Sequence, residues 1–162
     1  MYKINIKSNN TSKTLRLGKS LSKLLTKGDI VVLSGELGSG KTKFVEGFLQ
    51  NYGLEKEISS PTFNIVNEYL SSENNIYHFD VYRLEDSDEF YAIGGEEYFE
   101  KGICLIEWGE LISDVLPKDY IHISIHKDST NENSRVFELK INDNSKYIDI
   151  LNKLKEEFNW KF

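Results

Sequence analysis

The chain of 162 residues has a single cysteine, two prolines and three arginines, and it lacks any long apolar run. One cysteine cannot form an internal disulfide, and Cys104 lies within the apolar stretch ICLI, which indicates a buried, unreactive thiol. No segment reaches the ~18 apolar residues that a membrane span needs, and the first ten residues lack the apolar core of a signal peptide. We therefore expect a soluble, cytoplasmic protein that has no membrane partner.

Positive charge is also scarce, since the formal net charge is −6 at pH 7. Phosphate contacts to nucleic acid need clustered Lys and Arg, so this balance argues against a broad surface that binds nucleic acid unaided. It leaves open a nucleic acid that is reached through a partner protein. The three arginines are Arg16, Arg83 and Arg135, which limits the search for an arginine that acts in catalysis.

The hydrophobic pattern predicts one domain, residues 1–162, of the α/β class. Residues 2–8 alternate like an edge strand, and residues 29–35 have the apolar run of a central strand. Two strand pairs have the pattern of antiparallel hairpins: 62–70 with 75–84, and 120–126 with 134–142. We expect a central mixed sheet that helices flank on both faces, giving three layers.

Helical spacing marks segments 11–28, 41–53 and 145–160, and the acidic segment 85–102 predicts short helices that break at Gly94 and Gly95. We expect Thr11 or Ser12 to cap the first helix and Gly28 to end it.

The strongest chemical signal is GELGSGKT, residues 35–42, which fits the pattern G-x-x-x-x-G-K-[ST]. An apolar strand precedes it and an amphipathic helix follows it, which is the context that a phosphate-binding loop requires; a glycine-rich turn before a helix is the alternative. Glycines let backbone N–H groups turn inward as an anion-binding nest at the positive end of that helix. We expect Lys41 to reach the β- and γ-phosphates and Thr42 to offer its hydroxyl to Mg²⁺. The remaining loop residues expected to contact the nucleotide are Glu36, Leu37, Gly38, Ser39 and Gly40.

Two carboxylates at predicted strand ends are candidates to complete this site. Asp80 ends the run IYHFD and Glu107 ends the run ICLIE. A phosphate loop needs a second anchor for Mg²⁺, commonly an acidic residue at the end of a neighbouring strand. We expect one carboxylate to help hold Mg²⁺, directly or through water, and the other to orient the attacking water. The alternative for each is a solvated charge at the end of a strand.

The stretch SSPTF, residues 59–63, presents Thr62 from a turn that Pro61 restricts. A threonine at this place is similar to the switch threonines that sense a γ-phosphate and its Mg²⁺, although a threonine that caps a strand fits the pattern equally well.

The three histidines show no metal-ligand spacing. His78 precedes Asp80 by two residues and should share its face of the strand, where it either lines the site or forms a structural hydrogen bond. His122 and His126 occupy the polar face of an alternating strand, which predicts surface positions.

The phosphate loop alone does not identify the reaction. The chain has no N-K-x-D stretch of the kind that reads guanine, so adenine is the expected base. It also has no insertion long enough for the lid and acceptor domain of a small-molecule kinase. Three classes stay open: an ATPase that acts as a coupling subunit, a small-molecule or nucleoside kinase, and a nucleotide-binding scaffold without turnover.

Four motifs occur in one order, GELGSGKT, SSPTF, YHFDVYRL and GICLIEWGE. In this order the chain resembles, over nearly its whole length, the bacterial tRNA threonylcarbamoyladenosine biosynthesis ATPase family, TsaE (formerly YjeE). The resemblance implies a P-loop NTPase fold and a role in threonylcarbamoyl (t6A) modification of adenosine 37 in ANN-decoding tRNAs. It further implies a heterodimeric partner, made of the threonylcarbamoyl transferase and its inactive paralogue, which ATP binding and hydrolysis reset between turnovers. The tRNA would then be reached only through that complex.

The resemblance also implies ATP or ADP and Mg²⁺ as ligands and assigns roles to residues in the matching motifs. Lys41 and Thr42 would bind nucleotide and Mg²⁺, and Thr62 would belong to a switch-like segment. Asp80 and Glu107 would form the catalytic and metal site, and Trp108 would pack close to the nucleotide.

The chain departs from the family pattern at two loop positions. Glu36 stands where the family usually has Asp, and Ser39 where it often has Ala, but phosphate contacts at these positions come from the backbone. Arg83 is the only arginine near a proposed site residue, and we expect it to form a structural ion pair. With no obvious arginine finger, slow ATP hydrolysis is expected from the protein alone.

Overall fold

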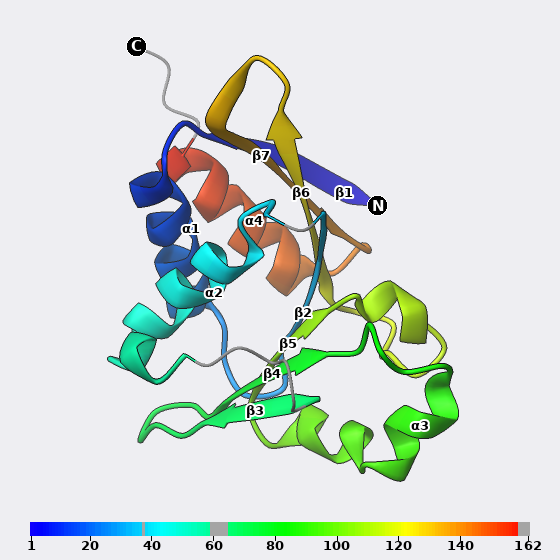
Figure 1. Ribbon diagram of the computed structural model, residues 1–162. Coiled ribbons are helices and arrows are strands. Elements are labelled where there is room, and N and C mark those ends of the chain that lie inside the picture. Colours follow the sequence, from blue (N-terminus) through cyan, green and yellow to red (C-terminus); the bar gives the residue numbers. More distant parts are fainter. Residues whose placement is uncertain (37, 59–64, 159–162) are drawn as a thin grey trace.

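The computed structural model describes residues 1–36, 38–58 and 65–158 (Figure 1). Within these residues one seven-stranded sheet has the order β1-β7-β6-β2-β5-β4-β3. The strands are β1 (Tyr2–Ser8), β2 (Ile30–Gly35), β3 (Val66–Tyr69), β4 (Ile76–Asp80), β5 (Ile103–Glu107), β6 (Ile121–Asp128) and β7 (Asn131–Ile141).

The sheet is mixed, as the sequence predicted. β2 runs parallel to its neighbours β5 and β6, and β4 runs parallel to β5. β3 pairs with β4 and β6 with β7 in antiparallel hairpins, and β1 is an edge strand antiparallel to β7. The second hairpin is longer than predicted, because pairing continues to Asp128 and Asn131 in the polar stretch between the two alternating segments.

Helices cover both faces of the sheet (Figure 1). On one face lie α1 (Thr11–Leu24), α2 (Lys41–Gln50) and α4 (Ser145–Phe158), with the short η1 (Glu55–Glu57) after α2. The other layer contains α3 (Ser87–Ala92), η2 (Gly95–Glu100) and η3 (Gly109–Ile112). The predicted helix break at Gly94 and Gly95 is therefore confirmed.

Two apolar clusters fill the spaces between the layers. Alternate residues of β2 point to opposite faces, so Val31 and Leu33 join the cluster under α1, α2 and α4, whereas Ile30 and Val32 join the other cluster. Cys104 lies in the second cluster, where burial raises the pKa of its thiol to about 12. The predicted three-layer α/β arrangement and the buried thiol are both confirmed.

The ends of α1 differ from the prediction. The cap is Asn10, whose side chain accepts a hydrogen bond from the Lys13 N–H at 2.8 Å, so the choice of Thr11 or Ser12 was wrong. The helix stops at Leu24, because Leu25 turns to extended backbone and becomes buried. Gly28 instead lies in the turn before β2, where its N–H donates to the Gly102 carbonyl at 2.9 Å.

The inner face of α4 includes the buried Leu151, Leu154 and Phe158, while Ile148 is only partly buried. No helix in the described part of the chain is long and apolar enough to cross a membrane.

Candidate nucleotide-binding site

The phosphate loop lies at the carboxyl end of β2 and leads directly into α2. The parallel neighbours of β2 bring both predicted carboxylates to the same edge of the sheet. Leu33 of β2 is opposite Glu107 of β5, and Glu107 is opposite Asp80 of β4. The loop and the two strand-end carboxylates, which are far apart in the chain, therefore gather where ligands bind in open α/β sheets.

The described part of the loop has the backbone shape of an anion site. Gly38 (φ 77°) and Gly40 (φ 112°) both have positive φ angles, which residues with a side chain rarely adopt. The Ser39 N–H donates to the Glu36 carbonyl at 2.9 Å, which closes the turn. Gly40 is the N-cap of α2 and provides no side-chain cap. The first-turn N–H groups, which have no acceptor within a helix, and the positive end of the helix dipole can thus serve a phosphate.

Lys41 and Trp108 contact each other beside this loop. The Lys41 ammonium group donates to the Gly35 carbonyl and lies 4.6 Å from the centre of the Trp108 ring. Trp108 follows β5 directly and adopts a left-handed backbone (φ 65°), with its N–H bonded to the Leu33 carbonyl at 3.0 Å. The Trp108 ring also contacts the ring of Tyr82, and the two ring centroids are 5.1 Å apart. Trp108 therefore lies against the lysine that is expected to bind phosphate.

Nucleotide binding is expected to change the fluorescence of Trp108, because a phosphate that attracts Lys41 removes its ammonium group from the indole ring. The measurement is a titration with ADP, with emission excited at the tryptophan band. Trp108→Phe leaves Trp160 as the single tryptophan of the chain, so the remaining emission comes from that residue. Trp108→Phe should lose the change while calorimetry still detects ADP binding; a full signal in this variant would contradict the placement.

Glu107 has a buried partner at the end of its apolar strand. It is 9% exposed, and its Oε2 lies 2.7 Å from Nε2 of His78 on the adjacent β4. A hydrogen bond of this kind offsets part of the cost of burying a carboxylate. The structural hydrogen bond, one of the two alternatives for His78, is confirmed, and its acceptor is a predicted site residue. A role of His78 in lining the nucleotide site stays a prediction.

Asp80 is less buried and ends β4. Its Oδ1 accepts a hydrogen bond from the Tyr82 N–H at 3.1 Å, which fixes the carboxylate at the turn after the strand. Thr42, the second residue of α2, is exposed at the loop.

These side chains fit the ligand preference of Mg²⁺. Mg²⁺ takes oxygen ligands, typically one or two carboxylates together with substrate phosphates and water. The Thr42 hydroxyl and the Asp80 and Glu107 carboxylates offer hard oxygen atoms of this kind. Among the residues with described positions, no three His, Cys, Asp or Glu side chains form a ready-made metal cage. The donor set therefore fits a metal that shares its coordination with a nucleotide.

Arg135 contacts the phosphate loop, which the sequence did not predict. Its Nε donates to the Ser39 carbonyl at 2.9 Å and its Nη2 to the Gly38 carbonyl at 3.2 Å. The prediction that Arg83 is the only arginine near a proposed site residue is therefore wrong. The strand order β7-β6-β2 brings Arg135 to the loop, and the residues next to Arg135 in the sequence do not predict that order.

A second polar cluster lies at the end of β2. Ser34 Oγ hydrogen-bonds to Glu110 Oε2 and lies 2.9 Å from His122 Nε2, which is itself 3.5 Å from Glu110. Burial acts to raise the pKa of Glu110, but the hydrogen bonds from His122 and Ser34 outweigh it and lower that pKa below its ordinary value. One imidazole nitrogen serves both neighbours, so this is no serine–histidine–carboxylate relay. His122 is partly buried rather than at the surface as predicted, whereas His126 is exposed.

Leu37 and Thr62 lie outside the described residues. Their expected roles, in the loop and in a switch-like segment, stay predictions.

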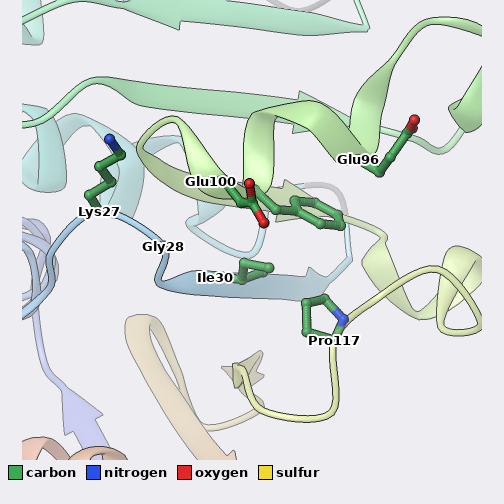
Figure 2. Close-up of a pocket in the computed structure, with 7 residues that line it drawn as sticks. Lys27, Gly28, Ile30, Glu96, Glu100 and Pro117 are labelled. Carbon is green, nitrogen blue, oxygen red and sulfur yellow. The ribbon is translucent and has the colours of Figure 1, made fainter.

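A hollow of about 520 Å³ lies elsewhere on the molecule (Figure 2). Ile30, at the start of β2, lines it, whereas the phosphate loop follows the end of that strand. The hollow therefore lies at the amino-terminal end of β2, opposite the carboxyl end that leads into the phosphate loop. Its lining is Lys27, Gly28, Ile30, Glu96, Phe99, Glu100 and Pro117.

Residues 8–136 match the sequence model of the family described as Threonylcarbamoyl adenosine biosynthesis protein TsaE. The chain belongs to the TsaE family. The matched range contains the phosphate loop, Asp80, Glu107, Trp108 and Arg135, whereas α4 lies beyond it.

Individual relatives agree with this assignment. The chain is 38% identical over 129 residues to the tRNA threonylcarbamoyladenosine biosynthesis protein TsaE of Bacillus subtilis, covering 79% of this chain and 80% of the relative. It is 40% identical over 119 residues to the protein of the same name from Treponema pallidum, covering 73% and 87%. The crystal structure of Bacillus subtilis YdiB superposes with a TM-score of 0.75 at 28% identity and covers 96% of both chains. The recognised family and the fold expected from it are therefore confirmed.

Proposed function

We propose that this protein is a P-loop ATPase that binds ATP or ADP with Mg²⁺ and serves the threonylcarbamoyl modification of tRNA. The observation that carries the proposal is the convergence of Lys41, Trp108 and the two strand-end carboxylates at one edge of the sheet. Membership of the TsaE family supports the tRNA-modifying role, because the relatives above are named for threonylcarbamoyladenosine biosynthesis.

In the proposed site, phosphates bind at the N-terminus of α2 and to Lys41. Thr42 and Asp80 would hold Mg²⁺, and the ion would supply positive charge beside the phosphates. Glu107 orients the attacking water, because its hydrogen bond to the buried His78 fixes the carboxylate in place. Phosphoryl transfer needs little covalent help from the protein, so positioning and charge carry most of the catalysis.

The protein acts, in this proposal, as a coupling subunit that binds a heterodimer of the threonylcarbamoyl transferase and its inactive paralogue. Its net charge of −6 suits a subunit that reaches tRNA through protein partners rather than by a basic surface of its own. Nothing in the comparisons favours the alternative of a small-molecule or nucleoside kinase.

ATP hydrolysis by the free protein is expected to be slow and to rise by about 10²-fold or more when the heterodimer is added, the gain typical of a newly placed catalytic group. Phosphate release with and without the heterodimer measures this, and tRNA modification is assayed in parallel. Modification should proceed through multiple turnovers only with ATP and this protein present. Phosphorylation of a metabolite without any effect on modification would contradict the proposal, and nucleotide binding without turnover in every mixture would indicate a scaffold.

A further inference from the structure

We propose that Arg135 is a positioning residue that holds the phosphate loop in its anion-binding shape. The inference rests on the nucleotide site proposed above and adds to it a side chain from β7, outside the loop. The contacts that carry it are the two hydrogen bonds from one guanidinium group to the consecutive carbonyls of Gly38 and Ser39.

The geometry of the peptide bond links these carbonyls to the inner surface of the loop. In a trans peptide the C=O and the following N–H point in opposite directions. Because Arg135 holds the Ser39 carbonyl at 2.9 Å, the N–H of Gly40 points away from the guanidinium group. Gly40 is the N-cap of α2, so this N–H belongs to the positive end of the helix. The Gly38 carbonyl shares its peptide with the Ser39 N–H, which donates to Glu36 at 2.9 Å and closes the turn.

Arg135 is itself held rigidly enough to serve as an anchor. Its Nη1 donates to the carbonyls of Glu132 at 2.6 Å and Ser134 at 2.9 Å, both at the start of β7. The planar fork of a guanidinium group can make all four contacts at once, which an ammonium group cannot match in geometry. The loop is thereby fixed to the β6–β7 hairpin and not only to β2 and α2.

The charge of Arg135 also favours an anion at this place. No ion pair between described residues involves Arg135, so no carboxylate of the described chain lies within salt-bridge distance of its guanidinium group. Its cross-strand partner Lys127 adds a second cation, with Nζ 3.4 Å from the position that a Cβ on Gly38 would occupy. The two residues differ in one respect: Arg135 binds loop carbonyls through a fork, whereas Lys127 supplies a point charge.

The test compares ADP affinity, by calorimetry on the whole chain, in Arg135→Ala, Arg135→Lys and Arg16→Ala. Arg135→Ala should weaken ADP binding by about tenfold or more, the cost of losing charged hydrogen bonds that shape the site. Arg135→Lys keeps the charge without the fork and should stay within about threefold of the alanine variant. Arg16, which packs over the Phe158 ring at 4.8 Å on α1, is the matched control, and Arg16→Ala should bind ADP as the wild type does.

Rescue separates positioning from a general loss of stability. Ethylguanidinium added to Arg135→Ala should restore part of its ADP affinity and should leave Arg16→Ala unchanged. Wild-type affinity in Arg135→Ala or in Arg135→Lys would overturn the inference, the latter because charge alone would then suffice. Should the alanine variant fail to fold, the lysine variant decides alone: ADP binding that is weaker than wild type by about tenfold or more supports the inference, and wild-type affinity overturns it. A wild-type protein that does not bind ADP would instead contradict the proposed function, and with it this inference.

Discussion

Lys41→Ala is expected to abolish partner-stimulated ATP hydrolysis and to weaken ADP binding by at least about tenfold, the typical loss for a charged hydrogen-bond donor at a phosphate site. Lys41 begins α2, and its ammonium group already lies between the Gly35 carbonyl and the Trp108 ring. A nucleotide would offer this ammonium group anionic phosphate oxygens in place of a neutral carbonyl, which adds the attraction between opposite charges to the hydrogen bond. Calorimetry with ADP and phosphate release with ATP measure the two effects.

Lys43 is the matched control for this substitution. It lies two residues further along α2, is 53% exposed and pairs with Glu46 at 3.0 Å on the outer face of the helix. An exposed pair of this kind contributes little, so Lys43→Ala should bind and hydrolyse nucleotide as the wild type does. Equal losses in Lys41→Ala and Lys43→Ala would show that helix α2 had been perturbed as a whole, and wild-type affinity in Lys41→Ala would contradict the nucleotide site.

The phosphate loop could be predicted because its residues are contiguous and the segments on either side of it have clear strand and helix patterns. The apolar run before Gly35 and the amphipathic run after Gly40 are local patterns, and they became β2 and α2. The proximity of Asp80 and Glu107 could also be predicted, since the carboxyl ends of parallel strands lie on the same side of a sheet. The antiparallel pairing of both predicted hairpins was confirmed for the same reason, since alternation and turn residues are encoded over short distances. The first hairpin is shorter than predicted, because β4 ends at Asp80, and its residues 62–64 lie outside the described residues.

The contacts that depend on strand order could not be predicted in this way. Nothing near Arg135 shows that β7 lies two strands from β2, yet that order alone brings its guanidinium group to the Gly38 and Ser39 carbonyls. The hydrogen bond from His78 to Glu107 likewise depends on the register between β4 and β5. A cross-strand register is set by packing of the whole sheet, and a single sequence contains little direct record of it.

Polar partners also decided details that residue preferences left open. Asn10, Thr11 and Ser12 are all accepted cap types, and only the backbone direction after β1 selects Asn10. His122 occupies the polar face of its strand as predicted, but Ser34 and Glu110 lie beside it because β2 is its parallel neighbour. In each case the residue type limited the choice, and tertiary structure made it.

Glu107→Gln is expected to lower the rate of ATP hydrolysis in the assembled complex by about 10²–10⁴-fold, the usual contribution of general acid–base groups. ADP affinity should stay within about threefold of wild type, because the phosphate contacts assigned to the loop and Lys41 remain. Glutamine retains the size of the side chain and can still hydrogen-bond to His78, so the change removes chiefly the charge that orients water. Single-turnover hydrolysis and ADP calorimetry, measured on the same preparation, separate the two quantities.

The contrast with two neighbouring carboxylates makes this result specific. Glu110→Gln removes a charge that is hydrogen-bonded to Ser34 and His122 rather than placed at the end of β5, and it should hydrolyse ATP at the wild-type rate. Asp80→Asn should weaken Mg²⁺ binding first, since its carboxylate is the proposed metal ligand, so a higher Mg²⁺ concentration should recover part of its rate. Extra Mg²⁺ should not rescue Glu107→Gln, because its defect lies in the attack of water. Normal hydrolysis by Glu107→Gln in the complex would remove Glu107 from the reaction, and its burial against His78 would then be structural alone.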